Sequence, residues 1–186
     1  MKKVLFVFGL LLTLDMFCAC SSNDGDNATD DSFGGDSEGT ENVLNPIEEG
    51  DGLDAITDFF NSELPNSSYS KGFFCSSPKN ANVGEKTCII INSKKELKDI
   101  YSGEKELPKI DFQQYSLVIG QVIMPAAGYR CVKQELVRNT INTNLTLNLY
   151  VENMFEYNPC IVVPLYYWGL YPKMQLSTVE VNVIML

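Results

Sequence analysis

Apolar and polar side chains alternate strictly in one stretch of the C-terminal half, and this alternation limits the possible folds more than any other feature. Between residues 145 and 152 every odd position is aliphatic, and every even position is polar or tyrosine. Successive side chains of a β-strand point to opposite faces, so this period of two predicts a strand with one buried and one solvated face. Strands of that kind are typical of antiparallel sheets.

The segments around this strand predict the rest of the fold. Residues 115–124 form a nearly continuous apolar run that favours a fully buried strand, and residues 129–137, 160–167 and 179–185 are further strand candidates. Apolar residues at helical spacing predict a helix over residues 52–63, and Ser93 followed by Glu96 forms a capping-box pattern that begins a second one. We therefore expect an α+β fold with an antiparallel sheet of about five strands and two short helices. The alternative is a β-sandwich-like arrangement.

The first residues have the pattern of an export signal. Lys2 and Lys3 precede an apolar stretch at residues 4–14, which is too short to span a hydrocarbon core of ~30 Å. The dipeptide Ala19-Cys20 resembles the lipobox of bacterial lipoproteins, in which the cysteine receives the lipid. This resemblance implies a signal peptide at residues 1–19 and a mature protein anchored to the membrane through lipidated Cys20. An ordinary secretory signal is the alternative.

The net charge of −10 is concentrated ahead of the predicted strands. Residues 21–70 carry acidic side chains and no basic one, whereas the two signs nearly balance from Lys71 onward. Residues 21–45 also have few large apolar side chains, so burial cannot offset their chain entropy. We expect the lipidated cysteine and a disordered acidic tether at residues 20–45, followed by a single globular domain at residues 46–186.

The position of the acidic stretch also bears on location. An acidic stretch directly after a lipidated cysteine resembles the surface-export signal of outer-membrane lipoproteins in gut anaerobes. This resemblance implies an outer-membrane lipoprotein that faces the cell surface. The periplasmic side is the alternative, in which the tether is only a solvated spacer.

Missing residue types exclude several functions. The chain has no histidine, which excludes Ser-His-Asp and Cys-His nucleophiles and histidine-based zinc sites. Its acidity argues against a nucleic-acid partner. No P-loop, dinucleotide fingerprint, GxSxG or EF-hand pattern is present, so we expect no cofactor and no metal. Acid–base chemistry would have to use carboxylates, and no spacing marks two of them as partners; the candidates are Asp111, Glu135, Glu152, Glu156 and Glu180.

Four cysteines remain in the chain after residue 20. Exported proteins with an even number of cysteines tend to form disulfides, and four cysteines allow three connectivities. Cys75 and Cys88 flank a polar stretch between two short apolar runs, so we favour their pairing, which leaves Cys131 with Cys160. A four-cysteine zinc site is the alternative, although none of the spacings is CxxC.

Two groups of residues are candidates for binding. The first is an aromatic cluster that includes the only tryptophan: Tyr166, Tyr167, Trp168 and Tyr171. Such rings form platforms for sugars or hot spots for proteins, but aromatic residues in a strand can equally pack in the core. The second is an unusually apolar connection between two predicted strands, with Met154, Phe155 and Tyr157, which is either an exposed recognition loop or a lid over the core.

Several short motifs lie between residues 91 and 184, which is about half of the chain. They are Ile91-Asn92-Ser93, Leu107-Pro108, Ile110-Asp111-Phe112, the Gly128-Tyr129 turn, Pro164 and Tyr167-Trp168-Gly169-Leu170-Tyr171-Pro172. With these motifs, residues 91–184 resemble the C-terminal domain of PrcB-type lipoproteins, which accompany a surface protease complex, and uncharacterised lipoproteins of gut anaerobes. This resemblance implies a regulator of an envelope protease.

Together these features predict a non-enzymatic, lipid-anchored binding module. Its partner is expected to be a protein, bound through the loops of the domain. The alternatives are a glycan-binding surface lipoprotein that uses the aromatic cluster, a protease regulator, and an enzyme that uses carboxylates.

Overall fold

The computed structural model describes residues 41–66, 68–74, 81–139, 144–155, 161–175 and 178–186. These residues form two helices and seven strands, which confirms the α+β class. In chain order the elements are β1 (Glu41–Leu44), α1 (Leu53–Glu63), β2 (Lys86–Ile91), α2 (Lys94–Ile100), β3 (Tyr115–Met124), β4 (Tyr129–Asn139), β5 (Leu145–Asn153), β6 (Val163–Pro172) and β7 (Val179–Met185).

The seven strands form two sheets, where the sequence predicted a single sheet of about five strands. One sheet has the order β1-β4-β5-β7 and the other the order β2-β3-β6, so the sandwich-like alternative describes the sheets better. All pairs are antiparallel except β5 and β7, which are parallel. The sequence did not predict the division into two sheets, because strands that follow one another in the chain do not always pair. The short turn at residues 125–128 carries the chain from β3 in one sheet to β4 in the other.

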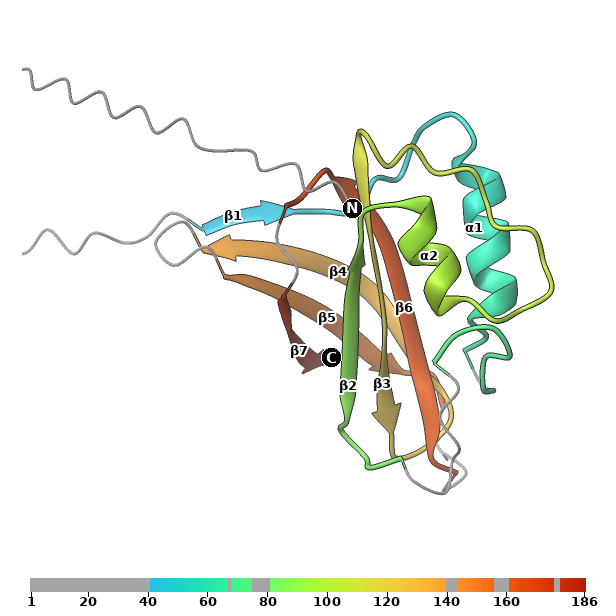
Figure 1. Ribbon diagram of the computed structural model, residues 1–186. Helices are drawn as coiled ribbons and strands as arrows, with labels where there is room; N and C mark the ends of the chain where they lie inside the picture. Colours follow the sequence, from blue (N-terminus) through green and yellow to red (C-terminus); the bar gives the residue numbers. More distant parts are fainter. Residues whose placement is uncertain (1–40, 67, 75–80, 140–143, 156–160, 176–177) are drawn as a thin grey trace, which may run out of the picture. The chain divides into compact units, whose positions relative to one another are not determined.

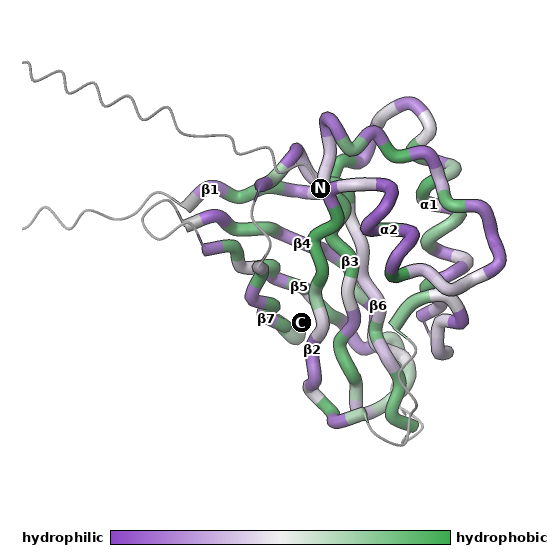
Figure 2. The backbone as a smooth tube through the Cα atoms, in the orientation of Figure 1, coloured by the Kyte–Doolittle hydropathy of each residue, from purple (hydrophilic) through white to green (hydrophobic). Residues whose placement is uncertain are grey.

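The β2-β3-β6 sheet is the central layer of the domain (Figure 1). One of its faces packs against the other sheet, and its other face packs against α1 and α2. Val118 and Val122 of β3 belong to the first core, whereas Leu117 and Ile119 belong to the second. The continuous apolar run of β3 therefore has a physical cause, because both faces of the strand are covered. Figure 2 shows hydrophobic stretches along the central strands and hydrophilic residues in the outer loops.

The alternating strand lies where the pattern predicted. In β5 the odd positions from Leu145 to Val151 are buried, and the even positions are only partly buried. The polar side of β5 lies on the outer face of its sheet, with charged side chains of β4 beside it. The prediction of one buried and one solvated face is confirmed.

The first helix begins and ends close to its predicted positions, and the second begins where the capping pattern predicted. In α1, Phe59 and Phe60 are both buried against the central sheet. In α2, the Ser93 hydroxyl accepts a hydrogen bond from the Glu96 amide (3.2 Å), and the Glu96 carboxylate accepts one from the Asn92 amide (2.6 Å). The first bond is the one that a capping box predicts, while the Glu96 carboxylate reaches one residue further back, and Ser93 is confirmed as the N-cap of the helix.

The folded domain begins earlier than predicted. The tether was expected to extend to residue 45, but Glu41–Leu44 form β1, which pairs with β4 in the register Glu41 to Asn139 and Leu44 to Leu136. The pairing uses backbone hydrogen bonds, which do not require apolar side chains. A composition argument therefore placed this boundary too late.

Candidate interaction site

The aromatic cluster does not form a surface platform. Tyr166, Tyr167 and Tyr171 are buried, so the prediction of an exposed binding site at these residues is wrong and the core alternative is right. Successive residues of β6 point to opposite faces of the central sheet. Tyr167 and Tyr171 thus lie in the inter-sheet core, whereas Tyr166 and Trp168 lie beneath the helices.

Trp168 belongs to a stack of rings under the helix layer. Its ring stacks on Phe60 of α1, with 4.8 Å between centroids, and Phe60 in turn contacts Phe59 and Phe73. Offset and edge-on ring pairs of this kind stabilise a core beyond the area that they bury. The single tryptophan is therefore a structural residue that holds α1 on the sheet.

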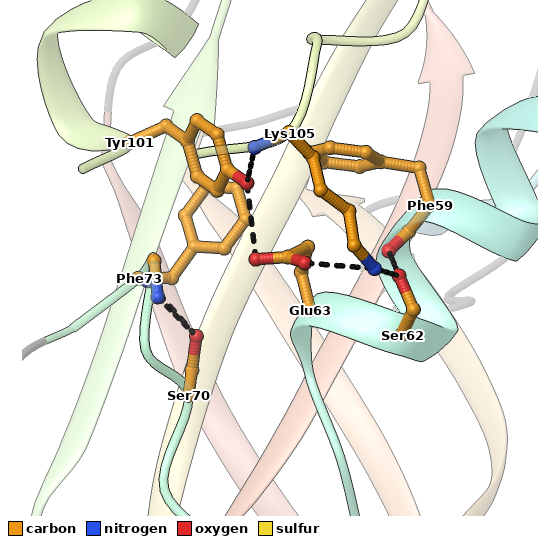
Figure 3. Close-up of polar contacts among 8 residues, drawn as sticks. Phe59, Ser62, Glu63, Ser70, Phe73, Tyr101 and Lys105 are labelled. Atoms are coloured by element: carbon orange, nitrogen blue, oxygen red, sulfur yellow. Dashed lines mark hydrogen bonds and ion pairs between the residues drawn. The ribbon is translucent and has the colours of Figure 1, made fainter. Parts of the chain in front are cut away.

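A small polar network closes the edge of this aromatic core (Figure 3). The Glu63 carboxylate of α1 accepts a hydrogen bond from the Tyr101 hydroxyl (3.0 Å) and forms an ion pair with Lys105 (3.1 Å). The Lys105 ammonium also donates to the Ser62 hydroxyl (2.7 Å). Burial, followed by the hydrogen bond with Glu63, raises the pKa of Tyr101. The network joins α1 to the segment after α2, so its role is structural. We call these four residues, Ser62, Glu63, Tyr101 and Lys105, the polar clip.

The two described cysteines point into the inter-sheet core. Cys88 and Cys131 pack against that core, no disulfide joins either of them to another described residue, and burial raises the pKa of each thiol to about 11. Their predicted disulfide partners, Cys75 and Cys160, lie outside the described residues. The two disulfides therefore stay a prediction.

The carboxylates that were candidates for acid–base chemistry have separate structural roles. On the outer face of the β4–β5 pair, Glu152 binds Arg130, and Glu135 binds Lys133 (2.6 Å) and the Tyr150 hydroxyl (2.7 Å). The hydrogen bonds from Lys133 and Tyr150 lower the pKa of Glu135.

None of the other candidate carboxylates is described in contact with Glu135 or Glu152. Asp111 accepts hydrogen bonds within its own turn, and Glu180 is an exposed residue of β7. Glu156 lies outside the described residues. Among the described residues, no group of three or more cysteine and carboxylate side chains is placed to hold a metal ion.

The apolar connection after β5 does reach the surface. Met154 and Phe155 are 48% and 56% exposed, while Tyr157 lies outside the described residues. The end of β7 lies beside them, because Val151 is in register with Met185 and the Leu186 amide donates to the Val151 carbonyl oxygen (2.9 Å). We call Met154, Phe155, Met185 and Leu186 the apolar end.

The last two residues of the apolar end were missed in the sequence. Met185 is 52% exposed and Leu186 is 71% exposed. The available signal was the apolar triplet at residues 184–186, which breaks the alternation of β7. A further exposed apolar residue, Ile161, precedes the start of β6, which pairs with the end of β3.

The apolar end lies far from the point where β1 joins the sheet. Glu41 is in register with Asn139 at the last residue of β4, whereas Tyr129 at the first residue of β4 is in register with Asn153. β4 is eleven residues long, so its two ends lie about 30–35 Å apart. The chain thus enters the domain at one end of the sheet, and the apolar end is at the other.

Comparison of the chain with family models, with curated proteins and with solved structures found no match. The resemblance to PrcB-type lipoproteins therefore rests on its short motifs alone. No helix within the described part of the chain has the length and apolarity needed to cross a membrane.

Proposed function

We propose that the protein is a lipid-anchored envelope lipoprotein of the outer membrane, displayed on the cell surface, whose folded domain binds a protein partner without catalysing a reaction. The lipobox-like Ala19-Cys20 and the acidic stretch that follows it support the anchor and the display. The apolar end supports the binding role.

The single observation that carries the proposal is the exposure of four apolar residues at the adjacent ends of β5 and β7. Exposed apolar side chains that gather in one place mark interaction sites more often than scattered ones do. Methionine and phenylalanine are also enriched in the buried centres of protein interfaces. The apolar end lies at the opposite end of β4 from β1, the first element of the folded domain, so the entry of the chain does not cover it.

The other candidate functions have less support. A glycan site at Tyr166, Tyr167, Trp168 and Tyr171 loses its basis, because three of these side chains are buried and the four are divided between two cores. Regulation of an envelope protease is compatible with an apolar protein-binding end, and the protease would then be the partner.

Site-specific photo-crosslinking in intact cells tests the binding role. A photoreactive amino acid at position 155 should join the protein to one discrete partner band. The matched control is position 43 on β1, where Val43 is also exposed (47%) but lies at the other end of the sheet. Equal crosslinking at both positions, or none at position 155, would contradict the proposal.

The anchor and the display are tested separately. Cys20→Ala should abolish lipid incorporation, measured by intact mass, and should release the folded domain from the membrane fraction. Protease treatment of intact cells should remove the wild-type domain from the surface. A domain that resists the protease until the outer membrane is opened would contradict surface display and would favour the periplasmic side.

A further inference from the structure

A second site lies in the central sheet, where β3 begins and β6 ends. A cavity of about 350 Å³ separates the segment that leads into α1 from the loop that leads into β3. Leu170 near the end of β6 and Tyr115 at the start of β3 help to line it, whereas the residues of the apolar end do not. Its volume is within the range of ordinary ligand pockets.

Backbone hydrogen bonds fix both walls of this cavity. On one side, the Ile47 amide donates to the Leu170 carbonyl oxygen (2.8 Å), and the Leu53 amide donates to the Gly50 carbonyl oxygen (3.2 Å). On the other side, Lys173 donates through its amide to the Gln114 carbonyl oxygen (2.8 Å). The Lys173 ammonium also donates to a carbonyl oxygen of the same loop (2.7 Å). A pocket with walls fixed in this way needs little reorganisation to bind a ligand.

The cavity has an apolar interior and an acidic rim. Ile47, Ile56 and Leu170 provide aliphatic surface, and the rim carries three carboxylates against the single ammonium of Lys109. The carboxylates are Glu49, Asp51 and Asp111.

The three rim carboxylates are not equally available. Both carboxylate oxygens of Asp111 accept hydrogen bonds, one from the Gln113 amide and the other from the Gln114 side chain (2.9 Å each). Glu49 and Asp51 are exposed, and no described side chain forms an ion pair with either of them. The rim therefore offers two unneutralised carboxylates above aliphatic surface.

We propose that this cavity binds a basic side chain, lysine or arginine, of a peptide segment in a protein partner. Long basic side chains place their methylene stem on apolar surface while the charged group stays at the rim. A carboxylate beside the charged group then forms a charge-assisted hydrogen bond. The site is separate from the apolar end, and its ligand need not be the partner bound there.

The chain's own tether is a poor occupant. Residues 21–40 contain acidic side chains and no lysine or arginine, so they would bring like charge to the rim. Charge complementarity thus favours an external basic segment over this acidic one.

Fluorescence polarisation with a short peptide tests the proposal on the mature lipoprotein in detergent. The probe is dye-labelled Gly-Leu-Lys-Leu-amide, and the comparison peptide has norleucine in place of lysine, which keeps the stem and removes the charge. We expect the lysine peptide to bind at least about fivefold more tightly, and the preference to decrease at high salt. Equal binding of the two peptides, or no binding of the lysine peptide up to millimolar concentration, would overturn the proposal.

Three variants locate the binding. Glu49→Gln with Asp51→Asn should weaken binding of the lysine peptide by roughly five- to tenfold, in line with the loss of two partly exposed ion pairs. The matched control is Glu48→Gln with Asp54→Asn, which removes the same charge from exposed residues that do not line the cavity, and it should bind as the wild type does. A similar loss in both double variants would show non-specific attraction and would overturn the proposal.

The third variant removes space and leaves the charges intact. Gly50 lines the cavity, and a Cβ atom there would meet no atom within 4 Å, so Gly50→Trp should fill the cavity without displacing its walls. It should abolish peptide binding while the unfolding midpoint stays close to that of the wild type. Unchanged binding in this variant would place the peptide elsewhere and would overturn the proposal.

Discussion

The two faces of the central sheet are built from different side chains. The core on the inter-sheet face is mainly aliphatic, with valine and leucine from β3 and β6 of the central sheet and from β5 and β7 of the other sheet. The helix-side face is rich in rings, including Phe59, Phe60, Phe73 and Trp168, which lie 4.8–6.4 Å apart between the centroids of contacting pairs.

The two cores therefore differ in the kind of contact that holds each outer layer on the central sheet. Between the sheets, many side chains of moderate size share the burial, so each contributes a small part of the total. Under the helices, stacked and edge-on rings make several of the contacts beside aliphatic side chains, and each ring contact depends on a particular partner. We therefore expect the helix layer to respond to single substitutions as a unit, and the sheet pair to respond locally.

Phe60→Ala should give the largest effect on the helix side. Removing this buried ring should lower the free energy of unfolding by about 3–5 kcal/mol, because it leaves a cavity under α1. It should also shift the emission of Trp168 to longer wavelength, because Phe60 stacks on that indole. Chemical denaturation followed by tryptophan fluorescence measures both.

The matched control on the inter-sheet side is Leu147→Ala. Leu147 is fully buried, and its truncation should cost about 2–5 kcal/mol. The native emission of Trp168 should not move, because Leu147 belongs to the other core. The same red shift in both variants would show that the two cores respond as one, which contradicts the comparison.

The thiols of the inter-sheet core provide a second test. With a pKa of about 11 instead of 9.0, Cys88 and Cys131 should have roughly a hundredfold less thiolate at pH 8 than an unperturbed cysteine. In reduced protein, maleimide labelling followed by mass spectrometry should therefore be slow in the native state and fast after unfolding. The raised pKa stabilises the fold below about pH 9, where the thiols are neutral in both states. That contribution should be lost as the pH rises toward 11.

The same experiment addresses the disulfides. Protein that is unfolded without a reductant should take up no label if Cys75, Cys88, Cys131 and Cys160 form two disulfides. Uptake of four labels would contradict that prediction and would show that all four cysteines are reduced in the protein. Fast labelling of Cys88 or Cys131 in the native protein would show that the inter-sheet core admits solvent.

Gly120→Ala tests how tightly the inter-sheet face is packed. Gly120 lies between Cys88 and Tyr167 in the sheet register, and a Cβ atom there would clash with both the Thr87 carbonyl oxygen and the Tyr167 hydroxyl. The hydrogen bond from Tyr167 to Thr87 (2.8 Å) would have to break or move. We expect a loss of about 1–3 kcal/mol in unfolding free energy. Gly50→Ala, which meets open space, is the control and should change little.

Local patterns predicted the elements whose side chains repeat along the chain. The period of β5, the helical spacing of α1 and the capping box of α2 all depend on residues within a few positions of one another. The exposed Met154 and Phe155 were found for a similar reason, because an apolar connection is unusual.

Features that depend on distant segments could not be predicted in this way. Rings occupy both faces of β6 at Tyr166, Tyr167 and Trp168. The sequence therefore shows no alternation of apolar and polar residues that would reveal which ring faces which core. The parallel pairing of β5 with β7 and the pairing of β1 with β4 depend on where the chain turns between sheets. The cavity beside α1 is formed by segments more than fifty residues apart, and no motif marks it.

The smallest effect should come from the polar clip at the edge of the helix layer. Glu63→Gln keeps an oxygen that accepts the hydrogen bond from Tyr101 but removes the ion pair with Lys105, whose side chain is 55% exposed. Because half-exposed ion pairs are screened by solvent, a double-mutant cycle with Lys105→Met should give about 0.2–1 kcal/mol, and less at high salt. If the rings hold α1, Trp168 emission should stay at its wild-type wavelength in all three variants. A red shift as large as that of Phe60→Ala would show that the clip, and not the ring stack, keeps α1 on the sheet.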